Sequence, residues 1–283
     1  MQAQVNAKEP YFEATMAEKL LILGGLLFPM QVLSQDSLAA RVAELHMLLD
    51  SAAHLSWEQA WPDEGPSINT CISYSLQRML SIPMADSTLD RVTRHEYLQR
   101  TRSADGRLWA FHWFENTGGS FHSYAHVFHL RTSASQGVTV GDNEEFLDGR
   151  APYSEIHRLR TKNGERLYLA LGEVRTCGSC CAQVAVVFRT TSDSLDLAYP
   201  AFAVEDEPAT PGYALNARCG SLLQWNYNAQ AQLIDYVFRL DDLSPVPVSD
   251  EQPDGIVRGS LRFDGERFIE YRGPVEAGNY PKP

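Results

Sequence analysis

Two aromatic segments separated by a short polar stretch decide the fold of this chain: LWAFHWF at 108–114 and FHSYAHVFHL at 121–130. Both segments are rich in the aromatic and apolar residues that strands favour, and their pattern repeats every two residues. The stretch between them contains Asn116-Thr117-Gly118-Gly119, and glycine at such a position is typical of a hairpin turn. The sequence therefore predicts an antiparallel β-hairpin here.

Further segments with the same alternation extend this prediction to a mainly β region. They are RLYLALGEV (166–174), AQVAVVFRT (182–190), LLQWNYN (222–228), QLIDYVFRL (232–240) and RFIEYR (267–272). Asp105-Gly106, Asn163-Gly164 and Asp264-Gly265 precede strands and fit tight turns with positive φ. The predicted fold class is mainly β, with antiparallel sheets arranged as a stack, an open barrel or a small propeller-like body.

The residues before this region have a helical period. Leucines and a valine recur every three or four residues after Asp36 or Ser37, either of which can cap a helix. A second helix is predicted for Ser67–Leu80, before Pro83. The expected organisation is a leader over residues 1–34, a helical cap over 35–102 and a mainly β domain over 103–283.

The leader has the layout of a secretory signal peptide that begins at an internal methionine. In Met16–Asp36, Lys19 precedes the apolar run Leu20–Phe28, and small residues precede a cleavage point between Ser34 and Gln35. The alternative is an N-terminal helix of the core. The signal pattern favours export, so we expect a periplasmic or secreted protein.

Composition excludes several classes of function. The chain has 283 residues, 44% of them hydrophobic, and a net charge of −12. A surplus of acidic groups argues against nucleic acid and against an anionic membrane surface as partners. No apolar run reaches the length of about 18 residues that a transmembrane segment needs.

The five cysteines bear on the same question, because an exported protein is expected to contain disulfides. They are Cys71, Cys177, Cys180, Cys181 and Cys219. The favoured pairing joins Cys219 to Cys180 or Cys181, since both regions belong to the predicted sheet. Inert thiols are an alternative, and the C-x-x-C spacing of Cys177 and Cys180 also fits a redox pair or half a zinc site.

The aromatic hairpin is the candidate binding site. About the predicted turn, Trp113 lies opposite His122, Phe111 opposite Tyr124 and Trp109 opposite His126, so all six side chains share one face. That face is either the core or a part-exposed platform for sugar rings or an aromatic peptide side chain. The predicted ligand-binding residues are Trp109, Phe111, Trp113, His122, Tyr124 and His126.

Catalytic chemistry has weaker support. His122 and His126 would share a zinc ion on a helix, but on a strand they stand about 13 Å apart, so a histidine from another strand would be needed. The chain has no G-x-S-x-G motif, phosphate-binding loop or dinucleotide fingerprint, and the acidic stretch at 142–148 lacks calcium-loop spacing. We expect no cofactor and no metal. The alternative function is a secreted hydrolase with a zinc or nucleophile site around the His122/His126 strand.

The hairpin region also resembles a family of exported bacterial proteins without assigned function. The resemblance spans roughly Arg100 to Arg272 and rests on an S-x-D-G turn, a tryptophan and a T-G-G turn. The matching residues are Ser103, Asp105, Gly106, Trp113, Thr117, Gly118 and Gly119. Phe114 stands where the family usually has aspartate. The resemblance implies secretion and a β-rich fold but no catalytic residue. We therefore expect a non-catalytic binding or structural protein of the bacterial cell envelope, with a carbohydrate or peptide as its possible ligand.

Overall fold

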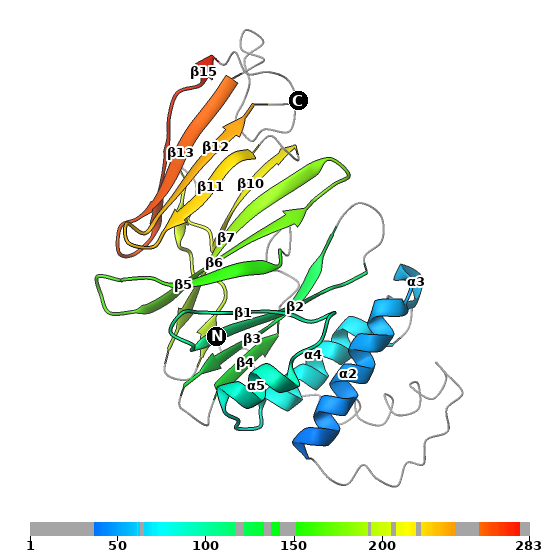
Figure 1. The fold of residues 1–283 in the computed structure, drawn as a ribbon. Helices are drawn as coiled ribbons and strands as arrows, with labels where there is room; N and C mark the ends of the chain where they lie inside the picture. The colour runs from blue at the N-terminus through cyan, green and yellow to red at the C-terminus, as the bar shows by residue number, and fades with distance from the viewer. Residues whose placement is uncertain are drawn as a thin grey trace, which may run out of the picture.

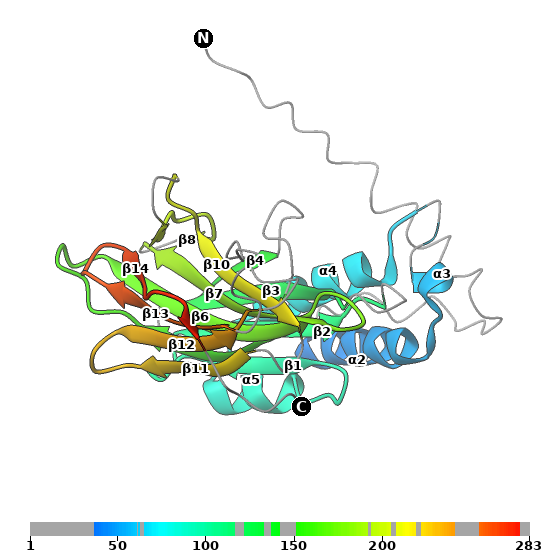
Figure 2. The same cartoon turned by 90° about the horizontal axis from the view of Figure 1, so that it is seen from above.

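A layer of helices followed by three stacked β-sheets forms the protein in the computed structural model (Figures 1 and 2). The structure describes residues 37–60, 62, 65–116, 122–132, 137–141, 151–191, 194–204, 208–218, 222–240 and 255–277. The predicted leader, residues 1–34, lies outside the described residues.

The helical layer comes from the N-terminal part of the chain. Its elements are α2 (Leu38–His54), α3 (Trp57–Ala60), α4 (Ile68–Leu80) and α5 (Asp86–Val92). Ser37 caps α2 by accepting from the Ala40 backbone N–H, and Ser67 caps α4 by accepting from Thr70. These two caps and the apolar stripes confirm the two predicted helices, whereas α5 was not predicted.

The first sheet carries the aromatic hairpin. Its strands lie in the order β1 (Gln99–Arg102), β2 (Leu108–Phe114), β3 (Tyr124–Arg131) and β4 (Gly137–Gly141), each antiparallel to its neighbour. The helices cover one face of this sheet, and a single apolar cluster contains buried residues from α2, α4, α5 and β2. The helical cap therefore shares its core with the β region.

The second sheet lies in the middle of the stack. Its order is β10 (Gly212–Arg218), β7 (Cys180–Thr190), β6 (Arg166–Arg175) and β5 (Tyr153–Arg158), with β8 (Leu195–Asp196) beside β7. Both of its faces are buried: Tyr168 and Ala170 pack toward the first sheet, whereas Leu169 and Leu171 pack toward the third. A strand buried on both faces needs apolar residues at every position, which explains the continuous apolar run in β6.

The third sheet closes the stack. Its elements are β11 (Leu222–Asn228), β12 (Leu233–Arg239), β13 (Gly255–Phe263), β14 (Phe268–Arg272), β9 (Phe202–Ala203) and β15 (Glu276–Ala277). The strands pair antiparallel except β14 with β9, which are parallel. Figure 1 shows the helices at one end of the molecule and this sheet at the other. The prediction of a mainly β fold with antiparallel sheets and a helical cap is confirmed, and of the arrangements considered the stack is the one found.

A buried carboxylate joins the second and third sheets. The Glu270 side chain is 5% exposed and accepts hydrogen bonds from Tyr213 Oη (2.6 Å), Tyr236 Oη (2.5 Å) and Arg272 Nη2 (2.8 Å). Burial raises the pKa of Glu270, but these hydrogen bonds outweigh burial and hold the pKa below its usual value. The cluster therefore fixes how β10 of the second sheet packs against the third sheet.

Candidate functional site

The predicted hairpin exists, but its register differs from the prediction. Trp113 lies opposite Ala125 instead of His122, and Trp109 lies opposite His129, a shift of three residues. The shift arises because the Glu115 N–H also bonds the Ser123 carbonyl (3.0 Å), so the connection is longer than the four-residue turn we assumed. An odd shift turns one strand's side chains to the other face of the sheet.

The expectation that six side chains share one face is therefore wrong. Trp109, Phe111 and Trp113 pack in the cluster under the helices and are at most 4% exposed. Tyr124 packs on the opposite face, against the second sheet, and His126 contacts Tyr153 of that sheet (ring centroids 5.0 Å apart).

The sixth residue, His122, precedes β3 and lies outside the strand. The structure thus places the three predicted binding residues of β2 in the core, and no continuous aromatic platform forms from the six predicted residues.

The residues of the S-x-D-G pattern build the turn between β1 and β2. Ser103 Oγ donates to Asp105 Oδ1 (2.6 Å) and accepts from the Leu108 N–H (3.0 Å), while Tyr168 Oη donates to Asp105 Oδ2 (2.8 Å). Gly106 has φ +71°, a conformation that glycine adopts without strain. These residues are therefore structural. Thr117, Gly118 and Gly119 lie outside the described residues.

Two histidines of the hairpin, His112 and His129, are buried, and burial lowers the pKa of each. His112, which is 2% exposed, has its Nε2 3.0 Å from Gln99 Oε1. Burial, together with charge repulsion from His126, lowers the pKa of His112 to about 3. Burial alone lowers the pKa of His129 to about 4.

The alternative of a metal site around His122 and His126 gains no support. His126 donates through Nε2 to the Ala151 carbonyl (2.8 Å), which fixes its ring inside the core. Among the described residues, no three histidine, cysteine, aspartate or glutamate side chains gather closely enough to hold a metal ion.

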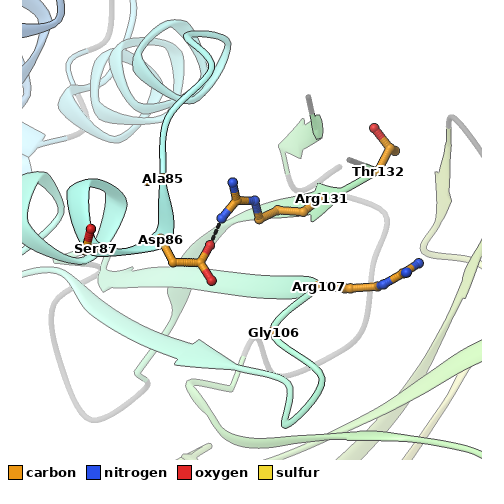
Figure 3. A pocket seen from close by; sticks show the side chains of 7 residues that line it. All are labelled: Ala85, Asp86, Ser87, Gly106, Arg107, Arg131 and Thr132. Carbon is orange, nitrogen blue, oxygen red and sulfur yellow. Dashed lines mark ion pairs between the residues drawn. The ribbon is translucent and has the colours of Figure 1, made fainter. Parts of the chain in front are cut away.

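A cleft lined by arginines lies where α5 meets the first sheet (Figure 3). It consists of two adjoining cavities of about 590 and 500 Å³ that share Asp86 and Ser87 at the start of α5. We call these cavities together the arginine cleft. Its four arginines are Arg100 and Arg102 from β1, Arg107 from the turn before β2, and Arg131 from β3.

Strand geometry explains why Arg100 and Arg102 lie side by side. Residues two apart on a strand share a face, so Arg100 and Arg102 both point to the side that α5 covers. Arg102 lies directly opposite Trp109 in the neighbouring strand, and its guanidinium carbon is 5.0 Å from the centre of the indole ring. This cation–π contact holds the Arg102 side chain over the tryptophan.

Two carboxylates of α5 anchor three of the four arginines. Asp86 pairs with Arg131 and with Arg102 (3.3 Å), and Asp90 pairs with Arg100 (2.9 Å). Arg131 also donates to the Met84 carbonyl (2.7 Å). These contacts connect α5 to the sheet and fix the orientation of the three guanidinium groups.

Arg107 differs from the other three. Its side chain is exposed, and it makes no hydrogen bond or ion pair with any part of the chain that the structure describes. In Figure 3 the Arg131 guanidinium turns toward Asp86, whereas the Arg107 side chain extends away from it. Four guanidinium groups against two carboxylates leave the cleft with a formal charge of +2, in a chain whose net charge is −12.

The sequence contained a signal for this cleft that our reading missed. Arg100 and Arg102 alternate just before the Asp105-Gly106 turn, and Arg107 follows that turn directly. However, the contributions of α5 and of Arg131 follow only from the tertiary structure. Of the six predicted binding residues, Trp109 lines the cleft.

The observed disulfides exclude one of the two pairings predicted for Cys219. Cys180 forms a disulfide with Cys177, so the alternative that joined Cys180 to Cys219 is wrong. The turn between β6 and β7 brings the two Cα atoms to 4.6 Å, within the usual range for a disulfide. Cys181 is disulfide-bonded as well. Cys219 lies outside the described residues, so the bond between Cys181 and Cys219 stays a prediction.

Comparison with known proteins does not assign this chain. No family profile matches it, and no curated protein is detectably similar in sequence. Within the described ranges, no helix is both long enough and apolar enough to cross a membrane. A function must therefore be argued from the site itself.

Proposed function

We propose that this protein is an exported, non-catalytic binding protein of the bacterial cell envelope that holds a carboxylate-bearing peptide or carbohydrate in the arginine cleft. The observation that carries the proposal is that four arginines line two adjoining cavities that contain only two carboxylates. Guanidinium groups recognise carboxylates through paired, charge-assisted hydrogen bonds.

The cleft is suited to binding because most of it is preorganised. Asp86 and Asp90 already orient Arg100, Arg102 and Arg131, so a ligand would not have to order these side chains. Arg107 remains for the ligand. The two cavity volumes fall in the range of small-molecule sites, roughly 300–1,000 Å³.

One residue of the predicted aromatic site, Trp109, also belongs to the proposed site, because it lines the arginine cleft. The indole N–H of Trp109 is buried and has no hydrogen-bond acceptor among the described residues. Leaving a buried donor without an acceptor costs about 1–3 kcal/mol. Trp109 lines the cleft through its ring, over which the Arg102 guanidinium lies.

Binding can be tested with two matched pairs of probes. We expect calorimetric titration to show binding of triglutamate but not of triglutamine, or of trigalacturonate but not of galactotriose. Added NaCl should weaken the interaction, because salt screens exposed charges. Equal binding of the charged and neutral members, or no binding in either pair, would contradict the proposal.

Arg107→Ala is expected to weaken binding of the charged probe by about tenfold or more, because a hydrogen bond to a charged group contributes about 1.5–3 kcal/mol. The thermal midpoint should stay unchanged, since the hydrogen bonds of Arg107 within the fold are made by its backbone, which the substitution keeps. Arg262→Ala is the matched control: Arg262 is an exposed arginine of β13 in the third sheet, far from the cleft in the order of layers. It should leave affinity unchanged.

Export is the second component of the proposal, and the disulfides support it. Disulfides persist mainly in oxidising compartments, and three of the five cysteines are disulfide-bonded in the described residues. We expect the intact mass of the secreted protein to begin at Gln35 and to gain a single alkyl group without reduction, at Cys71. A full-length intracellular product with five alkylated cysteines would contradict export.

A further inference from the structure

We propose that the Cys177–Cys180 disulfide is a thiol–disulfide exchange site that a dithiol of a partner protein reduces and that re-forms without unfolding. This inference is independent of the arginine cleft. It rests on the position of the bond, on the backbone that surrounds it and on the hydrogen bonds made by one of its sulfur atoms.

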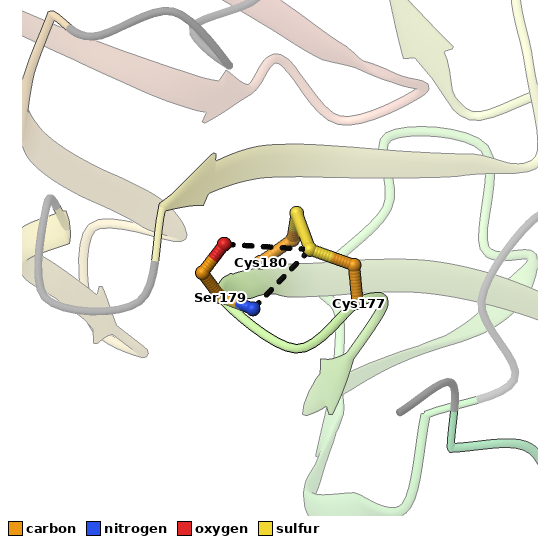
Figure 4. The surroundings of a disulfide bond; sticks show 3 residues. All are labelled: Cys177, Ser179 and Cys180. Carbon is orange, nitrogen blue, oxygen red and sulfur yellow. Dashed lines mark hydrogen bonds between the residues drawn. A yellow bond between two sulfur atoms is a disulfide. The ribbon is translucent and has the colours of Figure 1, made fainter. Parts of the chain in front are cut away.

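The bond lies at an accessible place. Cys177 and Cys180 are both part-exposed, and the two residues between them, Gly178 and Ser179, are exposed. Cys177 lies in the turn between the two long strands β6 and β7, and Cys180 is the first residue of β7 (Figure 4). Exchange requires a thiolate to approach a sulfur atom from outside, so accessibility is the first condition for this chemistry.

The bond contributes little to the fold. Its partners are separated by three positions in sequence, and the entropy that a crosslink removes from the unfolded chain grows with the length of the closed loop. The strands on either side pair directly beyond the turn, as Arg175 with Cys181 and Val174 with Ala182. Reduction should therefore leave the hairpin intact.

Backbone hydrogen bonds hold the turn independently of the sulfur atoms. The N–H groups of Thr176 and Cys177 donate to the Cys180 carbonyl (3.0 and 3.4 Å), and the Cys180 N–H donates to the Cys177 carbonyl (3.4 Å). After reduction these bonds would keep the two thiols adjacent. A preserved geometry of this kind allows the same disulfide to form again.

The hydrogen bonds to sulfur distinguish the two cysteines. The Ser179 backbone N–H donates to Cys177 Sγ (3.3 Å), and Ser179 Oγ lies 3.8 Å from the same sulfur (Figure 4). A donor aimed at sulfur stabilises the thiolate, and a stabilised thiolate is the better leaving group. Cys177 is therefore the sulfur that is released first.

The exchange proceeds in two balanced steps. A thiolate of the partner dithiol attacks Cys180 Sγ, which forms a mixed disulfide and releases Cys177 as a thiolate. The second thiol of the partner, once deprotonated, attacks the partner sulfur of the mixed disulfide and releases Cys180. The partner dithiol is oxidised to a disulfide, and Cys177 and Cys180 together take up its two electrons and two protons. Cys181 takes no part, because it is held in a disulfide of its own.

The first experiment uses the full chain and dithiothreitol as the dithiol, at pH 7, with acid quenching, alkylation and peptide mapping. We expect Cys177 and Cys180 to be reduced at least about tenfold faster than oxidised glutathione, while Cys181 stays bonded and the circular dichroism spectrum does not change. Reduction no faster than that of glutathione, reduction only together with Cys181, or loss of the spectrum would each overturn the proposal.

A matched pair of variants tests which sulfur is released. Cys180→Ala leaves the Cys177 thiol beside the Ser179 N–H, and Cys177→Ala leaves the Cys180 thiol. We expect iodoacetamide to alkylate Cys177 in the first variant several-fold faster than Cys180 in the second, with peptide mapping to separate both from Cys71. Ser179→Ala in the Cys180→Ala background keeps the N–H and should keep the fast rate. Equal rates for the two thiols would overturn the assignment of Cys177.

Discussion

Trp113→Ala is expected to lower the free energy of unfolding by about 3–5 kcal/mol, the range found when a buried tryptophan or phenylalanine is truncated. The Trp113 side chain is fully buried in the cluster between the helices and β2. Its indole N–H donates to Asn69 Oδ1 (3.0 Å), and Asn69 in turn donates to the Glu115 carbonyl (3.1 Å). The substitution therefore opens a cavity and leaves a buried amide oxygen without its donor. Urea denaturation followed by circular dichroism would measure the loss.

Trp113→Phe separates these two contributions. The phenyl ring fills most of the site but cannot donate to Asn69, so we expect a smaller loss, about 1–3 kcal/mol. Tyr124→Ala is the second comparison, because Tyr124 is part-exposed on the opposite face of the hairpin. A loss below 1 kcal/mol for Trp113→Ala would show that β2 is not a core strand, and an exposed aromatic platform would have to be considered again.

Lowering the pH from 7.5 to 5 is expected to remove about 4 kcal/mol of stability, of which His112 and His129 each account for about 2 kcal/mol. The pKa values of these histidines are lowered from 6.5 to about 3 and about 4 by burial. At pH 5 the unfolded chain binds a proton at each residue, whereas the folded protein binds almost none. Stability is thus complete above pH 6.5 and is lost as the pH falls toward the folded-state pKa values.

Between pH 7.5 and 5, most carboxylates contribute little to the change in stability, so the change reports mainly on these two histidines. Asp105, Asp264 and Glu270 have pKa values below the ordinary 3.8 to 4.5, so their contributions are lost mainly at lower pH. We expect His112→Phe and His129→Phe each to halve the loss between pH 7.5 and 5, measured by urea denaturation at both values. Val127→Ala replaces an uncharged residue of β3, the strand that contains His129. It should destabilise the protein equally at both pH values. An unchanged pH dependence in both histidine variants would contradict the assignment.

Local chemistry determined much of the fold. Strands β2 and β11 have the predicted bounds, and β6, β7, β12 and β14 differ from the prediction by no more than two residues at either end. The Gly106, Gly164 and Gly265 turns all have positive φ, as the Asp-Gly and Asn-Gly pairs predicted. These features could be predicted because alternation, capping residues and turn residues act over a few neighbouring positions.

Features that depend on distant residues were not predicted. The register of the hairpin depends on the length of a connection that extends from Asn116 to His122, and the T-G-G motif suggested a tighter turn. The helix α5 is short and has no side-chain cap, so it lacked the signals that identified α2 and α4. The edge strand β1 is polar and four residues long, and its place is set by pairing with β2.

The candidate site illustrates the same division. The sequence by itself determined a mainly β chain with two capped helices. It also indicated Trp109 as a candidate binding residue and Cys177 and Cys180 as a C-x-x-C pair. Only the tertiary structure decided that Trp109 lies beneath Arg102, and that Arg131 meets Asp86 from a strand far along the chain. The physical reason is that alternation fixes which side chains share a face, whereas sheet register and layer packing fix what that face meets.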